Sequence, residues 1–245
     1  RPPRSTPKPS SAASDVYKRQ IPSPLSRSIE DYLKVIYDLS RGEEPASTSA
    51  IAEALEIQPA SVTGMVKRLA EIGLLEHVPY RGVRLTKAGH REALRVLRRH
   101  RVIETYLCER LGYPWDDVHA EAERLEHAVS DDLVERMASA LGYPSHDPHG
   151  APIPTTTGDI EHMDLATLAD AAPGSKLRIQ AVRDEEAKEL RTMAAEGLLP
   201  GVNVQVNEGP QIEGVVDIVV GDSQGPSLAV KTELARRIYV EPQEE

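Results

Sequence analysis

Apolar residues recur every three or four positions through the first half of the chain, which is the spacing of amphipathic helices. In the first run, Ser26 precedes Ile29, Leu33 and Ile36 and is suited to cap a helix. The spacing predicts helices over residues 26–39, 47–55, 62–72, 86–108, 115–130 and 131–141. The second and third helices are separated by a short turn at residues 57–61, which is typical of a helix-turn-helix unit.

The pattern changes to alternation at two places. Residues 74–85 alternate around Arg81 and Gly82, which predicts a hairpin that would complete a winged helix. Residues 143–158 hold four prolines and two glycines and predict a linker. Beyond it, short alternating runs separated by glycine and proline predict a small β-barrel with strands at 176–182, 203–206, 214–220 and 227–230.

The start of the chain differs from the rest in composition. Residues 1–25 are rich in proline and serine and have almost nothing to bury, so we expect them to be disordered. Residues 11–20 also resemble a translated remnant of a sequencing adapter, which makes this tail either disordered or artefactual.

Charge is segregated along the 245 residues, although the net charge of -10 alone is unusual for a DNA-binding protein. Residues 58–101 hold ten basic and three acidic side chains, whereas residues 109–245 hold 11 basic and 27 acidic ones. A basic block can hold phosphates, while the acidic remainder can supply cation ligands or simply form a solvated surface. The longest apolar runs are too short to span a membrane, and the single cysteine, Cys108, suits a reducing compartment; we therefore expect a soluble cytoplasmic protein.

Six side chains suited to bind metal fall at helical spacing in the middle of the chain. Four of them lie within about 100° of arc on one predicted helix: His119, Glu123, Glu126 and His127. On the preceding helix, His100 and Glu104 add an imidazole and a carboxylate four residues apart. Imidazole and carboxylate together suit a divalent cation of borderline to hard character. An ordinary charged helix face is the alternative interpretation.

The chain resembles the diphtheria-toxin-repressor family of metal-dependent transcriptional regulators over about residues 26–241. The resemblance is carried by His100-Arg-x-x-Glu104, Val118-His-x-Glu-Ala-Glu-x-x-Glu-His127, Ser130-Asp131 and His149-Gly-Ala-Pro-Ile-Pro154. It implies a mainly α fold with a small β part. The implied domains are a winged-helix DNA-binding domain at 26–92, a helical metal-binding and dimerisation domain at 93–144, a Pro-rich linker at 145–165 and an SH3-like (FeoA-like) domain at 166–241.

The resemblance also implies two metal sites per chain. The primary site would consist of Asp31, Glu123, Glu126 and His127. The ancillary site would consist of His100, Glu104 and His119, completed by two carboxylates of the barrel, Glu186 and Glu189. These last two could instead belong to a solvated acidic loop.

Mn(II) is the expected metal, and Fe(II) is the alternative. Iron-responsive relatives carry methionine and cysteine where this chain has Asp31 and Glu123, so both soft ligands are replaced by carboxylates. The small manganese regulators have a glutamate ligand where this chain has Lys34, so their closely spaced metal pair is not expected here. For Cys108, a buried apolar thiol is the preferred interpretation over a ligand.

The third predicted helix and the wing are the expected DNA-reading elements, with cations that neutralise phosphates and short polar side chains that contact base edges. The predicted DNA-binding residues are Gln58, Ala60, Ser61, Thr63, Lys67, Arg68, Tyr80, Arg81 and Arg84. Gly64, where relatives carry a larger polar residue, indicates more reliance on DNA shape. A role of this motif in protein packing is the alternative.

The expected function is therefore repression of metal-uptake genes by a homodimer on palindromic double-stranded operator DNA, with no membrane partner and no small-molecule substrate. A helical-bundle metalloenzyme is the alternative from another class, but zinc proteases need His-Glu-x-x-His and di-iron bundles need Glu-x-x-His on two helices, and neither pattern is present. We therefore do not expect an enzyme. A constitutive winged-helix repressor that binds metal only for stability is a further alternative.

Overall fold

The computed structural model describes residues 25–40, 44–163, 165–183, 186–209, 212–221 and 225–243. Of the predicted tail at 1–25, all but Leu25 lies outside these ranges. The chain divides into two compact units, residues 1–90 and residues 91–245. None of the described helices is both long and apolar enough to cross a membrane.

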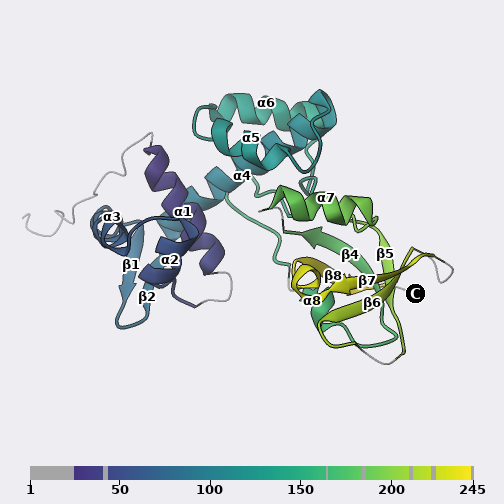
Figure 1. Cartoon of the computed structure of the whole chain (residues 1–245). Helices are drawn as coiled ribbons and strands as arrows, with labels where there is room; N and C mark the ends of the chain where they lie inside the picture. Colours follow the sequence, from purple (N-terminus) through teal and green to yellow (C-terminus); the bar gives the residue numbers. More distant parts are fainter. Residues whose placement is uncertain are drawn as a thin grey trace, which may run out of the picture. The chain divides into compact units, whose positions relative to one another are not determined.

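The first unit is a winged helix, as predicted (Figure 1). Its elements are α1 (Arg27–Leu39), α2 (Thr48–Ala54), α3 (Pro59–Glu71), β1 (Leu75–Val78) and β2 (Gly82–Leu85). Ser47 caps α2 by accepting the Ala50 N–H, and a proline fills the first position of α3, where no hydrogen-bond donor is needed. Ile29, Leu33 and Ile36 of α1 are at most 2% exposed, so the predicted apolar stripe forms the core of this unit.

The hairpin is held against the segment before α2. β1 and β2 pair antiparallel, with Leu75 opposite Leu85, and Val83 pairs with Ala46. At Gly82, where φ is 128°, a Cβ atom would lie 2.1 Å from the carbonyl oxygen of Ala46. Only glycine allows this approach, so Gly82 fixes where the second strand of the wing begins.

The helix α4 (Lys87–Leu111) leads into the second unit, where α5 (Val118–Leu125) and α6 (Asp131–Leu141) follow. The bounds of α6 are those predicted, because Ser130 caps its start and Gly142 ends it with a φ of 80°. The helix α5 is shorter than predicted. It ends at Leu125, and the Ala128 N–H bonds to the Leu125 carbonyl in a tighter turn. Glu126 and His127 therefore lie on this turn and not inside a continuous helix.

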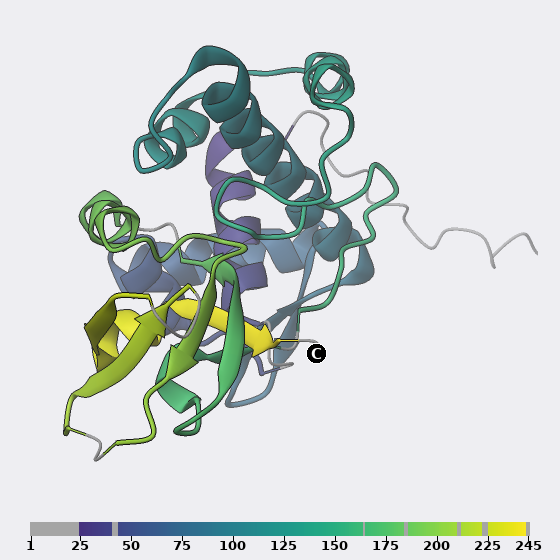
Figure 2. The same cartoon turned by 90° about the vertical axis from the view of Figure 1, so that its right-hand side faces the viewer.

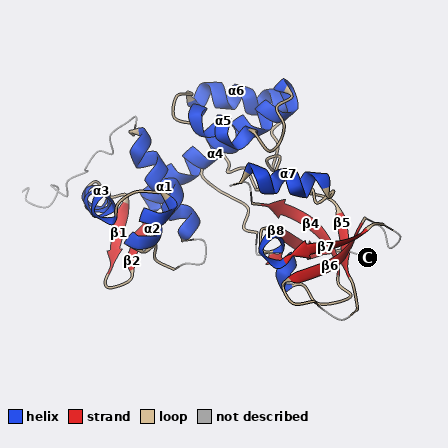
Figure 3. Ribbon diagram, in the orientation of Figure 1, coloured by secondary structure: helices blue, strands red, loops and turns tan. Residues whose placement is uncertain are grey.

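The rest of the second unit is a sheet domain, whose strands are red and whose helices are blue in Figure 3. Six antiparallel strands follow the order β3-β8-β4-β5-β6-β7: β3 (Ala166–Thr167), β8 (Ile238–Pro242), β4 (Lys176–Val182), β5 (Asn203–Val206), β6 (Val215–Val220) and β7 (Ser227–Lys231). The helices are α7 (Ala187–Ala195), α8 (Thr232–Ala235) and a 3-10 turn at Leu168–Asp170. The predicted β4 and β5 match in full, whereas β3, β8 and both helices were not predicted.

One apolar core fills the sheet domain. Strand residues Ile179 and Ile218 are fully buried together with Leu190 and Met193 of α7. Figures 1 and 2 show α7 lying over the strands, with α5 and α6 beyond it. Trp115, from the loop between α4 and α5, packs against the same core, so the helical part and the sheet domain share a contact.

The predicted linker is held in place at residues 149–154. Arg98 and Arg101 of α4 donate to the carbonyls of Pro154 and Pro152, and the Val182 N–H of β4 donates to the carbonyl of His149 at 2.9 Å. At Gly150, a Cβ atom would lie 2.0 Å from the carbonyl oxygen of Gln180. The segment is thus a fixed strap between α4 and β4.

Candidate metal centre and DNA-reading surface

His100 is the central side chain of the candidate metal centre. Its Nδ1 contacts a carboxylate oxygen of Glu126, and its Nε2 lies 2.9 Å from Oε1 of Glu104. Both carboxylates are 0% exposed. Burial of two negative charges is costly unless positive charge lies beside them, so this arrangement calls for a protonated imidazole or a metal cation.

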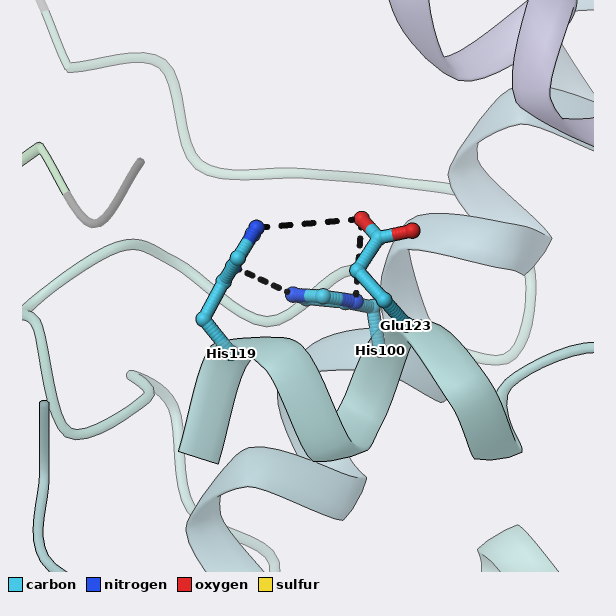
Figure 4. A group of neighbouring side chains, drawn as sticks. All are labelled: His100, His119 and Glu123. Carbon is cyan, nitrogen blue, oxygen red and sulfur yellow. Dashed lines mark hydrogen bonds and ion pairs between the residues drawn. The ribbon is translucent and has the colours of Figure 1, made fainter. Parts of the chain in front are cut away.

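His119 and Glu123 of α5 complete the first group of potential ligands (Figure 4). The Nδ1 of His119 is 3.2 Å from Nε2 of His100, and Oε1 of Glu123 is 3.9 Å from Nδ1 of His100. The three side chains point toward one another and offer ligand atoms within 4.8 Å of one another. The predicted facing of α4 and α5 is thus confirmed for His100, His119 and Glu123.

A second group of potential ligands shares Glu123. Glu123, Glu126 and His127 offer ligand atoms that are also within 4.8 Å of one another, and Nε2 of His127 is 3.2 Å from Oε1 of Glu126. The structure therefore brings together the three primary-site residues predicted on this segment. Asp31 lies on α1 of the first unit, 30% exposed, with Nε of Arg27 at 3.9 Å from its Oδ2. Its part in the site remains a proposal.

A third group includes two residues that the sequence did not suggest as ligands. Glu104, Asp147 and His149 are all buried and offer ligand atoms within 4.8 Å of one another. The Asp147 Oδ1 accepts the backbone N–H groups of His149 and Ala151 at 2.9 Å each, and its Oδ2 is 3.4 Å from Nε of Arg101. In the sequence, His149 was singled out only as the start of the motif His149-Gly-Ala-Pro-Ile-Pro154, and Asp147 was not singled out.

The ring of His149 is oriented for ligation. Its Nε2 lies 2.8 Å from the carbonyl oxygen of Trp115, and the two rings stack with centroids 5.4 Å apart. Because a carbonyl can only accept, Nε2 carries the proton and Nδ1 of the neutral ring keeps the lone pair that a metal needs. A carbonyl partner of this kind is the common second contact of metal-binding histidines.

The two predicted barrel ligands lie beside an arginine. Glu189 of α7 has its Oε2 2.9 Å from Nε of Arg237, and Oε1 of Glu186 is 3.3 Å from Nη2 of the same guanidinium. Among the described residues, neither carboxylate belongs to a group of three or more potential ligands. No such group of the described residues joins them to His100, Glu104 or His119, and their ligation stays a prediction.

Sulfur is absent from all three groups of potential ligands in the described part of the chain. Cys108 of α4 is partly buried, and burial raises the pKa of its thiol, with a smaller contribution from the Glu109 charge. A raised pKa disfavours the thiolate that would bind metal. The donors at hand are therefore oxygen and nitrogen.

Most of the predicted DNA-reading residues lie at exposed positions of α3 and the wing. All five predicted residues within α3 are exposed: Ala60, Ser61, Thr63, Lys67 and Arg68. Gln58 is the exposed N-cap residue of α3. At the wing, Tyr80 is fully exposed with a φ of 63°, Arg81 forms an ion pair with Glu44, and Arg84 is half-buried.

Comparisons with known proteins agree over most of the chain. Family models match the N-terminal DNA binding domain of iron dependent repressors at residues 24–83, their metal binding and dimerisation domain at 86–155, and the FeoA domain at 166–242. The iron-dependent repressor IdeR of Mycobacterium leprae is 31% identical over 225 residues, which cover 86% of this chain and 96% of that protein.

Manganese regulators are also among the similar proteins. A solved structure of a manganese-dependent transcriptional repressor in complex with manganese has a TM-score of 0.80 and 34% identity, and the match covers 88% of this chain and 100% of that one. The regulator MntR of Oceanobacillus iheyensis is 36% identical over 116 residues, which cover 47% of this chain and 78% of that protein.

Proposed function

Since the chain belongs to the family of metal-dependent transcriptional repressors that includes the diphtheria toxin repressor, we propose that it is an Mn(II)-responsive member. In this proposal a homodimer binds a palindromic operator and represses metal-uptake genes. The observation that carries the choice of metal is the donor set around His100, which consists of carboxylates and imidazoles without sulfur. Weakly binding Mn(II) is held by hard oxygen donors and selected by geometry.

For the primary site we propose Asp31, Glu123, Glu126 and His127, with His100 beside them. When bound, the metal supplies the positive charge that joins carboxylates of both units. Asp31 belongs to the helix α1 that packs in the reading unit, whereas Glu123 and Glu126 belong to the second unit. Ligation by both fixes α3 relative to the two-fold axis of the dimer.

This linkage explains how metal would control DNA binding. Two reading helices match successive major grooves only when they lie about 34 Å apart. A coupling free energy of about 1–3 kcal/mol between metal and DNA changes operator affinity by roughly 5- to 150-fold. The exposed Ser61, Thr63 and Lys67 then contact base edges and phosphates.

For the second site we propose Glu104 with Asp147 and His149. All three are at most 6% exposed, and the Trp115 carbonyl sets the His149 tautomer that ligation requires. The family resemblance also suggested Glu186 and Glu189, which contact Arg237 in the structure; their part in this site stays a prediction. The number of sites per chain stays at two.

The test is DNA binding at buffered free Mn²⁺ and Fe²⁺, with a duplex selected from a random pool in the presence of Mn²⁺. Binding should require the metal and should be lost in Glu126→Ala, while Glu121→Gln on the same helix α5 should behave like the parent protein. If the protein bound the DNA duplex with equal affinity in chelator and in excess Mn²⁺, the proposal that metal controls DNA binding would be contradicted. Gel filtration of each variant checks that the dimer persists.

An Fe(II)-responsive repressor is the second candidate, because relatives that match 86% of this chain are iron-dependent repressors. The two candidates are separated by Asp31→Met with Glu123→Cys, which introduces softer donors. If the present carboxylates select Mn(II), this double variant should shift the order of activation toward Fe²⁺. An unchanged order would show that selectivity lies elsewhere.

A further inference from the structure

Gly64 is an exposed glycine in the middle of α3, the helix that reads the operator in the proposed function. At about 100° per residue, it lies roughly 160° around the helix from the buried Val62 and Val66, and so faces away from the core. We propose that glycine at this position lets the backbone of α3 lie against the edges of the bases, and that a larger residue would hold the helix out of the major groove. The inference rests on the proposed DNA-binding function and not on the choice of metal.

The fold of the protein does not require glycine at this position. Gly64 has an ordinary helical backbone, and an added Cβ atom would meet no atom of the described residues within 4 Å. The other glycine inside a described helix, Gly89 of α4, differs, because its Cβ atom would lie 2.0 Å from the carbonyl oxygen of Leu74. A glycine inside a helix lowers the stability of the helix, since it loses the most conformational freedom on folding. Packing thus explains Gly89, whereas close approach of a partner explains Gly64.

The neighbours of Gly64 on the surface of α3 identify DNA as that partner. Residues three and four positions before and after it share its face of the helix. All four are exposed and belong to the predicted DNA-reading residues: Ala60, Ser61, Lys67 and Arg68. The whole face lies within the DNA-binding domain matched at residues 24–83. Gly64 is therefore at the centre of the surface that α3 presents to the operator.

The side chains around Gly64 leave its backbone accessible. Ala60 has only a methyl group, and the hydroxyl of Thr63 donates to the carbonyl oxygen of Pro59 at 3.1 Å, which holds it against the helix. Lys67 and Arg68 are long enough to reach phosphates at the sides of the groove. A helix with its side chains is about 10–12 Å across, and the major groove is about 12 Å wide. Small residues on the leading face of the helix therefore decide how deeply it enters.

A cleft beside Gly64 decides which substitutions test the inference. It has a volume of about 540 Å³ and lies between α1 and α3, with Tyr32, Leu55 and Met65 among its lining residues. A long side chain at position 64 has room to fold into this cleft, whereas methyl groups on or next to Cβ stay at the helix surface. Gly64→Ala and Gly64→Val are therefore the informative variants. Ala54→Val, at an exposed position of α2 outside the predicted DNA-reading residues, is the matched control.

The experiment measures binding of the full chain, in excess Mn²⁺, to the duplex selected with the parent protein. Gly64→Ala should weaken binding about tenfold, as expected for one methyl group forced into a packed interface, and Gly64→Val should weaken it further. Ala54→Val should bind like the parent protein. The salt dependence of binding should keep its slope in Gly64→Ala, because no cation is removed. Thermal unfolding should show that Gly64→Ala is at least as stable as the parent protein, so that weaker binding does not come from loss of the fold.

The inference is overturned if the parent protein binds the duplex and Gly64→Ala binds it with the same affinity. It is also overturned if Ala54→Val weakens binding as much as Gly64→Val, or if the weaker binding of Gly64→Ala comes with a lower salt slope, which would assign the loss to phosphate contacts. A less stable Gly64→Ala would contradict the premise that the fold does not require this glycine. If the parent protein bound no DNA with either Mn²⁺ or Fe²⁺, the proposed function would fall, and this inference with it.

Discussion

Replacement of Glu126 by glutamine should remove the stabilisation that metal at the primary site gives to the fold. Glu126 is 0% exposed and contacts both His100 and His127. A ligand at 100 times its dissociation constant stabilises the native state by about 2.7 kcal/mol. For a unit the size of residues 91–245, each kcal/mol raises Tm by about 2–4 °C. An ion at the primary site should therefore raise Tm by about 5–10 °C at this saturation, and Glu126→Gln should lose that part of the gain while keeping any gain from the second site.

The Glu126→Gln variant should also lose some stability in the absence of metal, because Glu126 contacts His100. Glutamine keeps the volume and one acceptor oxygen, so the cost is at most that of one charged hydrogen bond, about 1.5–3 kcal/mol. The relevant quantity is thus the difference between Tm in chelator and Tm in Mn²⁺ for each protein, measured by circular dichroism. Glu121→Gln, which removes an ion pair with Arg124 on the surface of α5, is the control and should keep the full gain.

The outcome that refutes this reasoning is specific. If Glu126→Gln gained as many degrees from Mn²⁺ as the parent protein, Glu126 would not be a ligand and the stabilising ion would lie elsewhere. If the parent protein gained nothing, the buried carboxylates would be balanced by protonated imidazole alone.

Four further results are expected. Gly64→Ala should stabilise the protein by about 0.5–1 kcal/mol in urea unfolding, because a Cβ atom added at this position of α3 would meet nothing within 4 Å. Gly89→Ala should destabilise the protein by about 1–3 kcal/mol, because the added Cβ atom would lie 2.0 Å from the Leu74 carbonyl oxygen. Because burial raises the pKa of Cys108, its thiol stays protonated to higher pH than an ordinary cysteine, so the midpoint of its alkylation rate should shift upward in the folded protein only. Lys67→Gln should weaken operator binding and lower the salt slope by about one per subunit, whereas an unchanged slope would remove Lys67 from the phosphate contacts.

The local part of the fold could be predicted from the sequence because its signals are local. Ser130 and Gly142 mark the two ends of α6, and the alternation around Gly82 marks the wing. The helical spacing of His100, His119 and Glu123 was sufficient to predict that they meet across two helices. A cap, a turn residue and a period are each set by a few neighbouring positions.

The remaining features depend on contacts between distant segments. Asp147 and His149 join Glu104 only because the strap is tied to α4 and β4, and no pattern inside a proline-rich segment predicts that burial. The helix α7 was missed because its apolar side is limited to Leu190 and Met193, which become buried only against the sheet. The early end of α5 at Leu125 is likewise decided by the turn into α6.

The stacking of Trp115 on His149 has a practical consequence. Trp115 is the single tryptophan of the 245 residues, and its indole lies face to face with one candidate ligand. The chain thus has an intrinsic fluorophore at the strap. Paramagnetic Mn²⁺ at Glu104, Asp147 and His149 would quench its emission, while an ion bound elsewhere would leave the emission less affected. Metal binding at the site of Glu104, Asp147 and His149 can therefore be followed by tryptophan fluorescence, in unlabelled protein and without DNA.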